Sequence, residues 1–225
     1  MTTFSGWIKI LHCLGLFLIA VLWSSYVLSK PIAKLETQTD HFEFCVSLSP
    51  DFNLLKTEAL PLNTIHTIAN HYLYGTCGER DTSLAIKLME SAANKGHVES
   101  AYILGELFYV GETVPSNFDK SKKYYLMAAE KGSLKAQHEF GVVLLKEATT
   151  ENERLEALYW LGMAANQNDG FSAYILGMVH QTGLHGVPKN PCLALDWYEG
   201  AKTMGFPDRS GLHASLQRDF DSLCN

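Results

Sequence analysis

The segment Ser100-Ala-Tyr-Ile-Leu-Gly105 occurs a second time, letter for letter, as Ser172-Ala-Tyr-Ile-Leu-Gly177. Ala136-Gln-His-Glu-Phe-Gly141 lies halfway between the two copies and has its glycine in the same phase. The glycines that end these three segments are therefore spaced by 36 residues. A period of this size is typical of a solenoid, in which each repeat is a helical hairpin that packs on its neighbours.

Two further series of small residues keep the same period, apart from one additional residue in the last unit, which is expected in the loop Gly183–Val187. Three interleaved series with one period predict an all-α fold, a right-handed solenoid of about four 36-residue helical hairpins with N- and C-terminal caps. The two series are Ala92-Ala93, Ala128-Ala129, Ala164-Ala165 and Ala201-Lys202, and Ala85, Ser121, Ala157 and Ala194.

The unit 100–135 has the pattern of two helices. Its first helix has apolar or small residues at i, i+3, i+4 and i+7 from Ala101, which form one helical face. Gly111 is expected to end this helix in a turn. A second helix is predicted over about 119–131. Small residues such as Gly105 would let the two helices approach closely.

The unit 100–135 resembles the Sel-1-like repeat family. The resemblance rests on its Tyr-Val-Gly turn and on the start of its second helix, Asp-Lys-Ser-Lys-Lys-Tyr-Tyr. The last unit resembles it too, through a Gly-x-x-Gly-Val turn and Ala194-Leu-Asp-Trp-Tyr198. The resemblance implies a solenoid that serves as an adaptor or scaffold. Units 64–99 and 136–171 are the degenerate ones, and the flanking segments are expected to be an N-terminal cap region and a C-terminal capping helix. The predicted boundaries are 30–63 for the N-terminal cap, 64–99, 100–135, 136–171 and 172–207 for the repeats, and 208–225 for the C-terminal helix.

The N-terminal residues 1–29 differ from the rest of the chain. Residues 7–28 contain one Lys, one His and no acid, and they are long enough to cross a bilayer. The segment is either a signal peptide or an uncleaved anchor. Lys9 favours an inside N-terminus, whereas Lys30 and Lys34 oppose it. We expect the repeats to lie in the periplasm, secreted or tethered to the inner membrane.

Four cysteines lie outside the apolar segment, and none forms a C-x-x-C pair. An even number is typical of an oxidising compartment. Cys77 and Cys192 lie in the first and last units, too far apart in a solenoid for a disulfide. The predicted disulfides are therefore Cys45–Cys77 and Cys192–Cys224.

Motifs for catalysis or cofactor binding are absent from the sequence. It contains no H-E-x-x-H, G-x-S-x-G, S-x-x-K or Gly-rich phosphate loop. His66 and His71, like His180 and His185, are five residues apart, so neither pair shares a helical face. We predict no catalytic residue, no metal and no cofactor. The net charge of −6 argues against nucleic acid as a partner.

The first helices of such hairpins are expected to line the concave face, where a partner protein would bind. Aromatic and polar residues mix there, as they do at interface cores. Tyr124, Trp160 and Trp197 share one repeat position and are instead predicted to pack between hairpins. The predicted partner-binding residues are His66, Asn70, Tyr74, Tyr102, Glu106, Tyr109, His138, Lys146, Tyr174, Met178 and Gln181.

The sequence thus predicts an extracytoplasmic protein-binding scaffold, not an enzyme. The resemblance implies a bacterial envelope partner, because some envelope members of the family are immunity proteins that hold a secreted toxin. Other envelope members help to assemble exported polysaccharide. The membrane is expected to be touched only through the N-terminal segment. Two alternatives are a cell-envelope hydrolase with an unrecognised site and a membrane-anchored adaptor that faces the cytoplasm.

Overall fold

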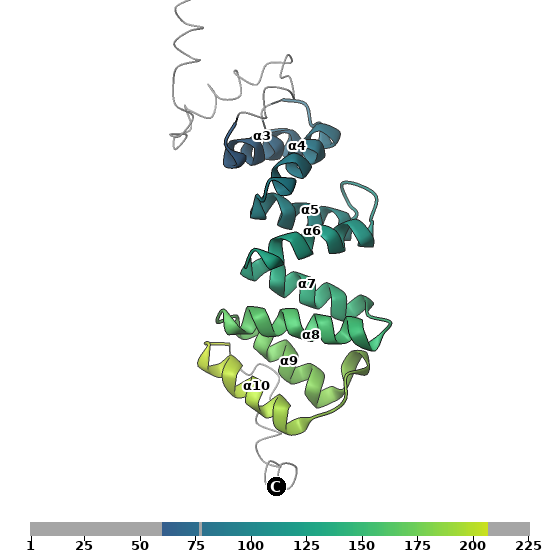
Figure 1. The fold of residues 1–225 in the computed structure, drawn as a ribbon, viewed down its shortest axis with the longest axis vertical. Coiled ribbons are helices and arrows are strands. Elements are labelled where there is room, and N and C mark those ends of the chain that lie inside the picture. The colour runs from purple at the N-terminus through teal and green to yellow at the C-terminus, as the bar shows by residue number, and fades with distance from the viewer. Residues whose placement is uncertain (1–59, 77, 207–225) are drawn as a thin grey trace, which may run out of the picture.

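The computed structural model describes residues 60–76 and 78–206, and the regular secondary structure of this part of the chain is entirely helical. Its α-helices form hairpins stacked along one axis, from α3 at one end to α10 at the other (Figure 1). Extensive contacts join only consecutive helices within the described part. This arrangement confirms the predicted all-α solenoid.

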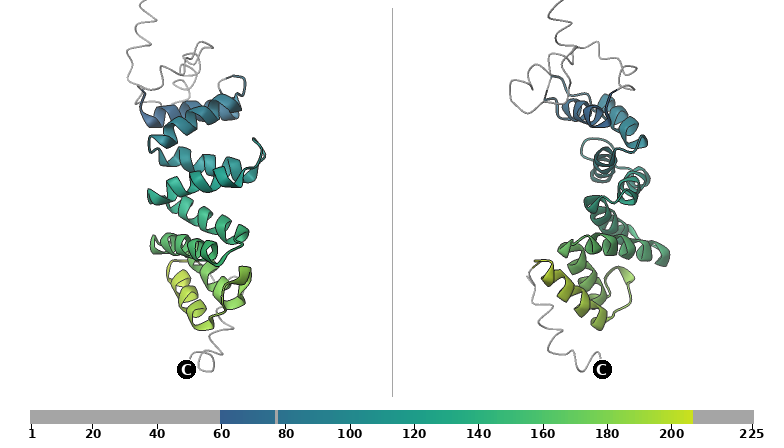
Figure 2. Two further views of the ribbon diagram at one scale, coloured as in Figure 1. Left: turned by 45° about the vertical axis from the view of Figure 1, so that its right-hand side comes forward. Right: turned by 60° about the vertical axis from the view of Figure 1, so that its left-hand side comes forward.

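The hairpins are α3–α4, α5–α6, α7–α8 and α9–α10, and turned views show the same stacking order (Figure 2). Each hairpin pairs a first helix with a longer or equally long second helix, and a short 3-10 helix lies in the last connection. The first helices are α3 (Leu62–Tyr74), α5 (Val98–Val110), α7 (Leu134–Glu147) and α9 (Gly170–Thr182), the second helices are α4 (Thr82–Asn94), α6 (Phe118–Glu130), α8 (Glu151–Asn166) and α10 (Pro191–Thr203), and the 3-10 helix is η2 (Leu184–Gly186).

The glycine series exists because a side chain of the second helix lies directly on the backbone of the first. A Cβ atom on Gly105 would lie 2.6 Å from Cδ1 of Tyr125, and one on Gly177 would lie 2.6 Å from Cδ1 of Tyr198. At Gly141 the same atom would lie 2.7 Å from Cγ of Leu161. Real Cβ atoms do not come so close, so these positions accept only glycine without a shift of the neighbour.

The small and aromatic positions form the core that the repeat pattern predicts. All the residues of the alanine pairs in the first three units are buried. Tyr124 stacks on Phe108 of its own hairpin, with 5.9 Å between ring centroids, and donates a hydrogen bond to Glu90 of the preceding one. Trp160 is 8% exposed and packs against Phe140. The prediction that these aromatic residues pack between hairpins is therefore confirmed for Tyr124, whereas the ring contacts of Trp160 lie within its own hairpin.

The first helices begin two residues before each predicted unit boundary. The N-terminal caps are the reason: the side chains of His97, Ser133 and Asp169 accept hydrogen bonds from the third backbone N–H that follows. Gly111 ends α5 in the left-handed conformation, as predicted. In the degenerate third unit Ala148 ends α7 in an extended conformation, and the helix is one residue longer than α5.

Several predictions fall on residues outside the described part of the chain. These are the N-terminal segment 1–29, most of the cap 30–63, and the C-terminal helix 208–225. Cys192 is disulfide-bonded, but Cys45, Cys77 and Cys224 all lie outside the described residues, so the two predicted pairings stay predictions. Within 60–76 and 78–206, no helix combines the length and the apolar character needed to cross a bilayer.

Candidate functional site

A shallow groove of about 170 Å³ lies on the face formed by the first helices, between the N-terminal halves of α5, α7 and α9. We call it the aromatic groove. Leu134 is 37% exposed and Phe171 is 46% exposed, so both present apolar surface at the groove. The groove is lined by Tyr102, Leu134, Lys135, His138, Glu139, Asp169 and Phe171.

Tyr102 forms one wall of the aromatic groove in an acidic environment. Burial raises the pKa of its hydroxyl to about 12, and the carboxylates of Glu106, Glu139 and Glu99 add to that shift. The ammonium group of Lys135 lies 5.9 Å from the centre of its ring. Tyr102 thus offers a partner a half-buried aromatic face with carboxylates around it.

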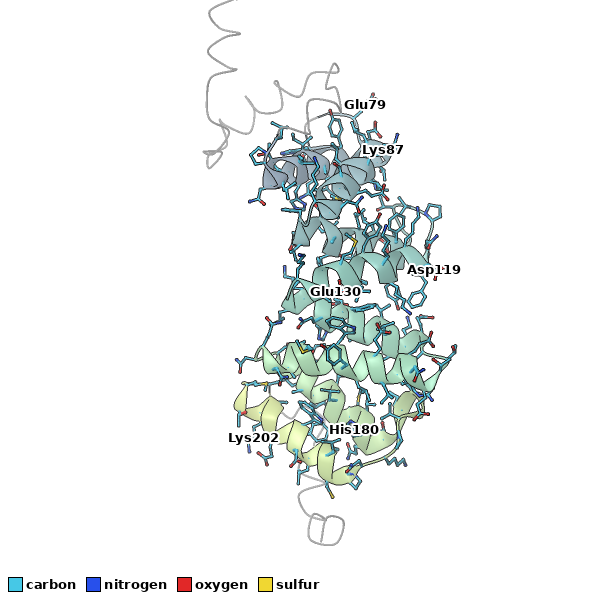
Figure 3. The ribbon with its side chains drawn as sticks, viewed as in Figure 1. Glu79, Lys87, Asp119, Glu130, His180 and Lys202 are labelled. Atoms are coloured by element: carbon cyan, nitrogen blue, oxygen red, sulfur yellow. The ribbon has the colours of Figure 1, made fainter. Side chains whose placement is uncertain are left out.

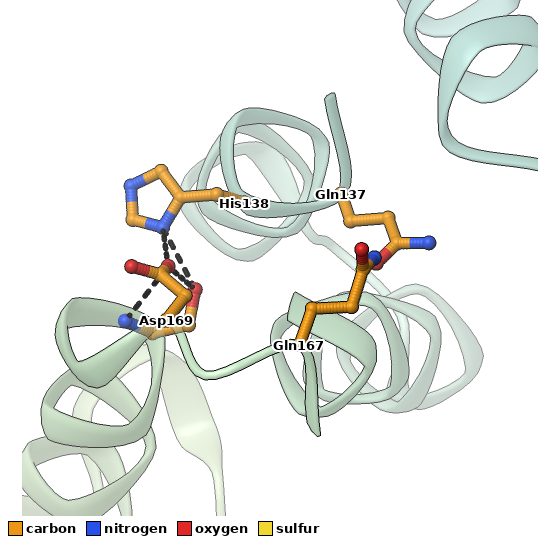
Figure 4. Close-up of polar contacts among 5 residues, drawn as sticks. Gln137, His138, Gln167 and Asp169 are labelled. Atoms are coloured by element: carbon orange, nitrogen blue, oxygen red, sulfur yellow. Dashed lines mark hydrogen bonds and ion pairs between the residues drawn. The ribbon is translucent and has the colours of Figure 1, made fainter. Parts of the chain in front are cut away.

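His138, Asp169 and Ser172 form a cluster at one edge of the groove (Figure 4). His138 Nδ1 lies 3.0 Å from Asp169 Oδ2 and 2.8 Å from Ser172 Oγ, and Asp169 accepts a hydrogen bond from the Ser172 backbone. The residue types are those of a nucleophilic triad, but the geometry differs. Ser172 is fully buried, and its hydroxyl contacts the aspartate directly. The cluster caps α9 and joins it to α7, so it gives no support to a hydrolase.

The same junction occurs two repeats earlier with different residues. Ser100 Oγ lies 2.9 Å from His66 Nδ1 and 2.8 Å from His97 Nδ1, and His97 Nε2 lies 2.9 Å from Asn63 Oδ1. His66 Nε2 also lies 3.0 Å from Asn70 Nδ2. His66 and Asn70, both predicted to bind a partner, are thus engaged in joining the first hairpin to the second.

The predicted residues near the C-terminal ends of the first helices lie apart from the aromatic groove. Lys146 Nζ donates a hydrogen bond to Tyr109 Oη at 3.0 Å, which links α7 to α5 on this face. Tyr74 is 67% exposed at the end of α3, and Glu106 is exposed on α5. These four side chains are accessible but line no pocket with the groove residues.

In the fourth unit the predicted residues pack within their own hairpin. The Tyr174 ring lies 5.4 Å from the Tyr198 ring, and Met178 packs against the same small cluster. Tyr198 donates a hydrogen bond to Gln181 Oε1 at 2.9 Å. All three are partly buried, so they offer a partner less surface than the sequence suggested.

Of the predicted set, only Tyr102 and His138 line the aromatic groove. Sequence reasoning missed Leu134, Lys135 and Phe171, which lie in the first turns of α7 and α9. The available signal for Leu134 and Phe171 was a large apolar residue within two positions of a capping residue, Ser133 or Asp169. In the part of the chain that the structure covers, no three His, Cys, Asp or Glu side chains gather as metal ligands would.

The sequence model of the Sel1 repeat matches four consecutive segments, 68–97, 98–133, 136–169 and 170–206. These segments make up more than half of the chain, and each overlaps one hairpin, although the first and third begin within α3 and α7. The chain therefore belongs to the Sel1 repeat family, as its sequence pattern indicated.

Individual relatives agree with this assignment. The chain is 32% identical over 144 residues to the chitin synthase regulator SKT5 of Saccharomyces cerevisiae, and the match covers 62% of this chain but 20% of that protein. The crystal structure of c5321, a protective antigen of uropathogenic Escherichia coli, aligns with a TM-score of 0.58 at 24% identity, over 75% of this chain and 36% of that one. A Sel1 repeat protein from Oxalobacter formigenes aligns with a TM-score of 0.57 at 23% identity, over 72% and 63%. At these identities the structural matches establish the fold.

Proposed function

We propose that this protein is a scaffold that binds another protein through the aromatic groove. The observation that carries the proposal is the exposure of Leu134 and Phe171 beside Tyr102, on a face built by three consecutive repeats. Exposed apolar and aromatic side chains that converge on one depression are typical of interface hot spots. Membership of a repeat family whose folds present extended binding surfaces supports the same conclusion.

The carboxylates around Tyr102 indicate the charge of the partner. Glu99, Glu106 and Glu139 surround it, whereas Lys135 is the one cation lining the groove. The whole chain is also acidic, with a net charge of −6. A partner with a basic contact surface would be steered towards this face, which raises the association rate more than the affinity.

We further propose that the repeats work outside the cytoplasm, in the bacterial periplasm. The apolar segment 7–28 and the even number of cysteines outside it support this location. The partner would then be a secreted effector that the protein neutralises, or a component of an envelope assembly that it escorts. A reporter fused after Asn225, active only outside the cytoplasm, tests the location; an inactive reporter would favour the adaptor that faces the cytoplasm.

The test of the binding function is affinity capture by the full-length, detergent-solubilised protein from cell-envelope extract. The groove variant is Leu134→Ser with Phe171→Ser, and circular dichroism checks its fold before capture because Phe171 also stacks on His138 and Phe206. The matched control is Leu155→Ser with Tyr159→Ser on α8, because each of these side chains is 57% exposed and lies away from the groove.

We expect one stoichiometric protein to be captured by the wild type and by the control, and at least tenfold less of it by the groove variant. Equal capture by all three would move the binding site to another surface. If the wild type captures no protein at all, the scaffold function itself is contradicted.

A further inference from the structure

The junction between α6 and α8 is closed by two glutamine side chains. Gln137 Nε2 donates a hydrogen bond to the carbonyl oxygen of Ala129 at 3.1 Å. Gln167 Nε2 lies 3.2 Å from the carbonyl oxygen of Gly132 and 2.7 Å from Gln137 Oε1. The two side chains point towards one another between the helices (Figure 4). The carboxamides therefore satisfy backbone acceptors at the C-terminal end of α6.

One repeat earlier, the same backbone lacks these two side chains. Gly96 has φ 94° and Gly132 has φ 84°, and each donates its N–H to the carbonyl three residues before it, at 2.8 and 2.9 Å. One 36-residue period before Gln137 the chain has Ala101, which is buried, and one period before Gln167 it has Lys131, which is exposed. The corresponding acceptors are the carbonyls of Ala93 and Gly96. Ala93 O accepts the backbone N–H of Gly96, and within residues 60–76 and 78–206 no side chain donates to either carbonyl.

A pocket of about 290 Å³ lies between the C-terminal ends of α4 and α6, over the first turn of α5, and Ala101 and Lys131 are among the residues that line it. Met127 and Ala101 supply an apolar wall, and Glu130 lies at its border. Glu130 and Lys202 mark the side of the molecule where second helices end, and Asp119 marks the opposite side (Figure 3). The pocket lies on this side, and its lining residues differ from those of the aromatic groove.

The charges around the pocket favour a neutral occupant. Lys95 and Lys131 line it and would repel a cation. The carbonyl ends of α4 and α6, together with Glu130, would repel an anion. A carboxamide fits both conditions, since its NH₂ group donates to carbonyl oxygens and its oxygen accepts from an ammonium group.

We propose that this pocket binds the carboxamide of a glutamine side chain on the protein partner, in the place that the chain's own glutamines occupy one repeat later. That the carboxamide belongs to a partner protein rests on the proposed scaffold function. The pocket would give this partner a second contact in addition to the aromatic groove, one that recognises a glutamine.

The pocket can be tested without the partner. Amide resonances of the ¹⁵N-labelled full-length protein in detergent micelles are followed during titration with acetyl-glutamine N-methylamide. The control probe is acetyl-methionine N-methylamide, which has a similar size but no side-chain donor. The blocked variant is Ala101→Gln with Lys131→Gln, which rebuilds the closed junction.

With the glutamine probe, we expect saturable changes in the amide resonances of Gly96, His97 and Lys131. The methionine probe should bind at least tenfold more weakly. In the blocked variant, the changes at Gly96 and His97 should be lost. Equal binding of both probes, or no saturable shift with either, would overturn the proposal. If the blocked variant does not fold, the preference of the wild type for glutamine over methionine decides the question.

Partner capture separates this inference from the function on which it rests. The blocked variant should capture at least tenfold less partner than the wild type, although its aromatic groove is unchanged. Undiminished capture by the folded blocked variant would remove the pocket from the interface and leave the scaffold function standing. Capture of nothing by the wild type would contradict the scaffold function, and the probe titration would still report on the pocket.

Discussion

The glycine at the centre of each repeat gives a direct test at the scale of one residue. Gly105→Ala should lower the free energy of unfolding by about 1–3 kcal/mol, because the new Cβ would lie 2.6 Å from the Tyr125 ring. Gly105→Leu should lower the free energy of unfolding further, because its side chain is larger. The measurement is urea unfolding followed by circular dichroism.

Gly162 on α8 is the matched control, since a Cβ added there meets no atom within 4 Å. Alanine is a better helix former than glycine, so Gly162→Ala should raise the free energy of unfolding by about 0.5–1 kcal/mol. If Gly105→Ala also stabilised the protein, the close helix contact would be wrong.

Residue-level features of the fold could be predicted from the sequence wherever the repeats agree. Gly105 and Ala129 were identified because their types recur at one period, and the structure buries both. Leu134 and Phe171 could not be found in this way. They occupy positions where the repeats differ, since the residue in phase with Leu134 is Val98 in one unit and Gly170 in another. A binding surface is made of such differences, which periodicity does not reveal.

At the scale of the helix, the cap of α5 is sensitive to acid. His97 Nδ1 accepts a hydrogen bond from the backbone N–H of Ser100, which only the unprotonated nitrogen can do. Burial, the main cause, lowers the pKa of His97 below its ordinary value near 6.5, although Glu99 opposes the shift. Burial and the neighbouring His97 lower the pKa of His66 in the same way.

The unfolded chain therefore binds protons on these histidines at a higher pH than the folded chain does. The stabilisation is complete above about pH 6.5 and falls as the pH drops from 6.5 through the lowered folded values. Thermal melts between pH 7.5 and 5 should show this loss.

The variant His97→Asp tests the same cap, because Asp169 already serves as the cap beside His138 at the later junction. The variant should lose less stability between pH 7.5 and 5 than the wild type does. An unchanged pH profile would show that the acid sensitivity arises elsewhere, for example at His180, whose pKa burial also lowers.

Each first helix begins two residues before the repeat boundary that the sequence predicted. The repeated hexapeptides begin inside the helices, three residues after the caps His97 and Asp169, and of these two only the histidine is an unexpected capping residue.

At the scale of the whole molecule, the fold is a chain of nearest neighbours. Extensive contacts within the described residues join only consecutive helices. The stability of such an array is a sum of repeat and interface contributions, so damage should stay local. Gly177→Ala, which would place a Cβ 2.6 Å from the Tyr198 ring, damages only the last hairpin.

Hydrogen exchange measured by mass spectrometry should therefore show faster exchange in α9 and α10 of the Gly177→Ala protein and a smaller increase in α8. Exchange in α3, α4 and α5 should stay as in the wild type, because no extensive contact links them to the last hairpin. Gly162→Ala serves again as the control and should speed exchange nowhere. A uniform increase along the chain would mean that the hairpins unfold as one cooperative unit. In that case a partner bound at the aromatic groove would stabilise the distant first hairpin as strongly as α9, and binding could be detected by protection there.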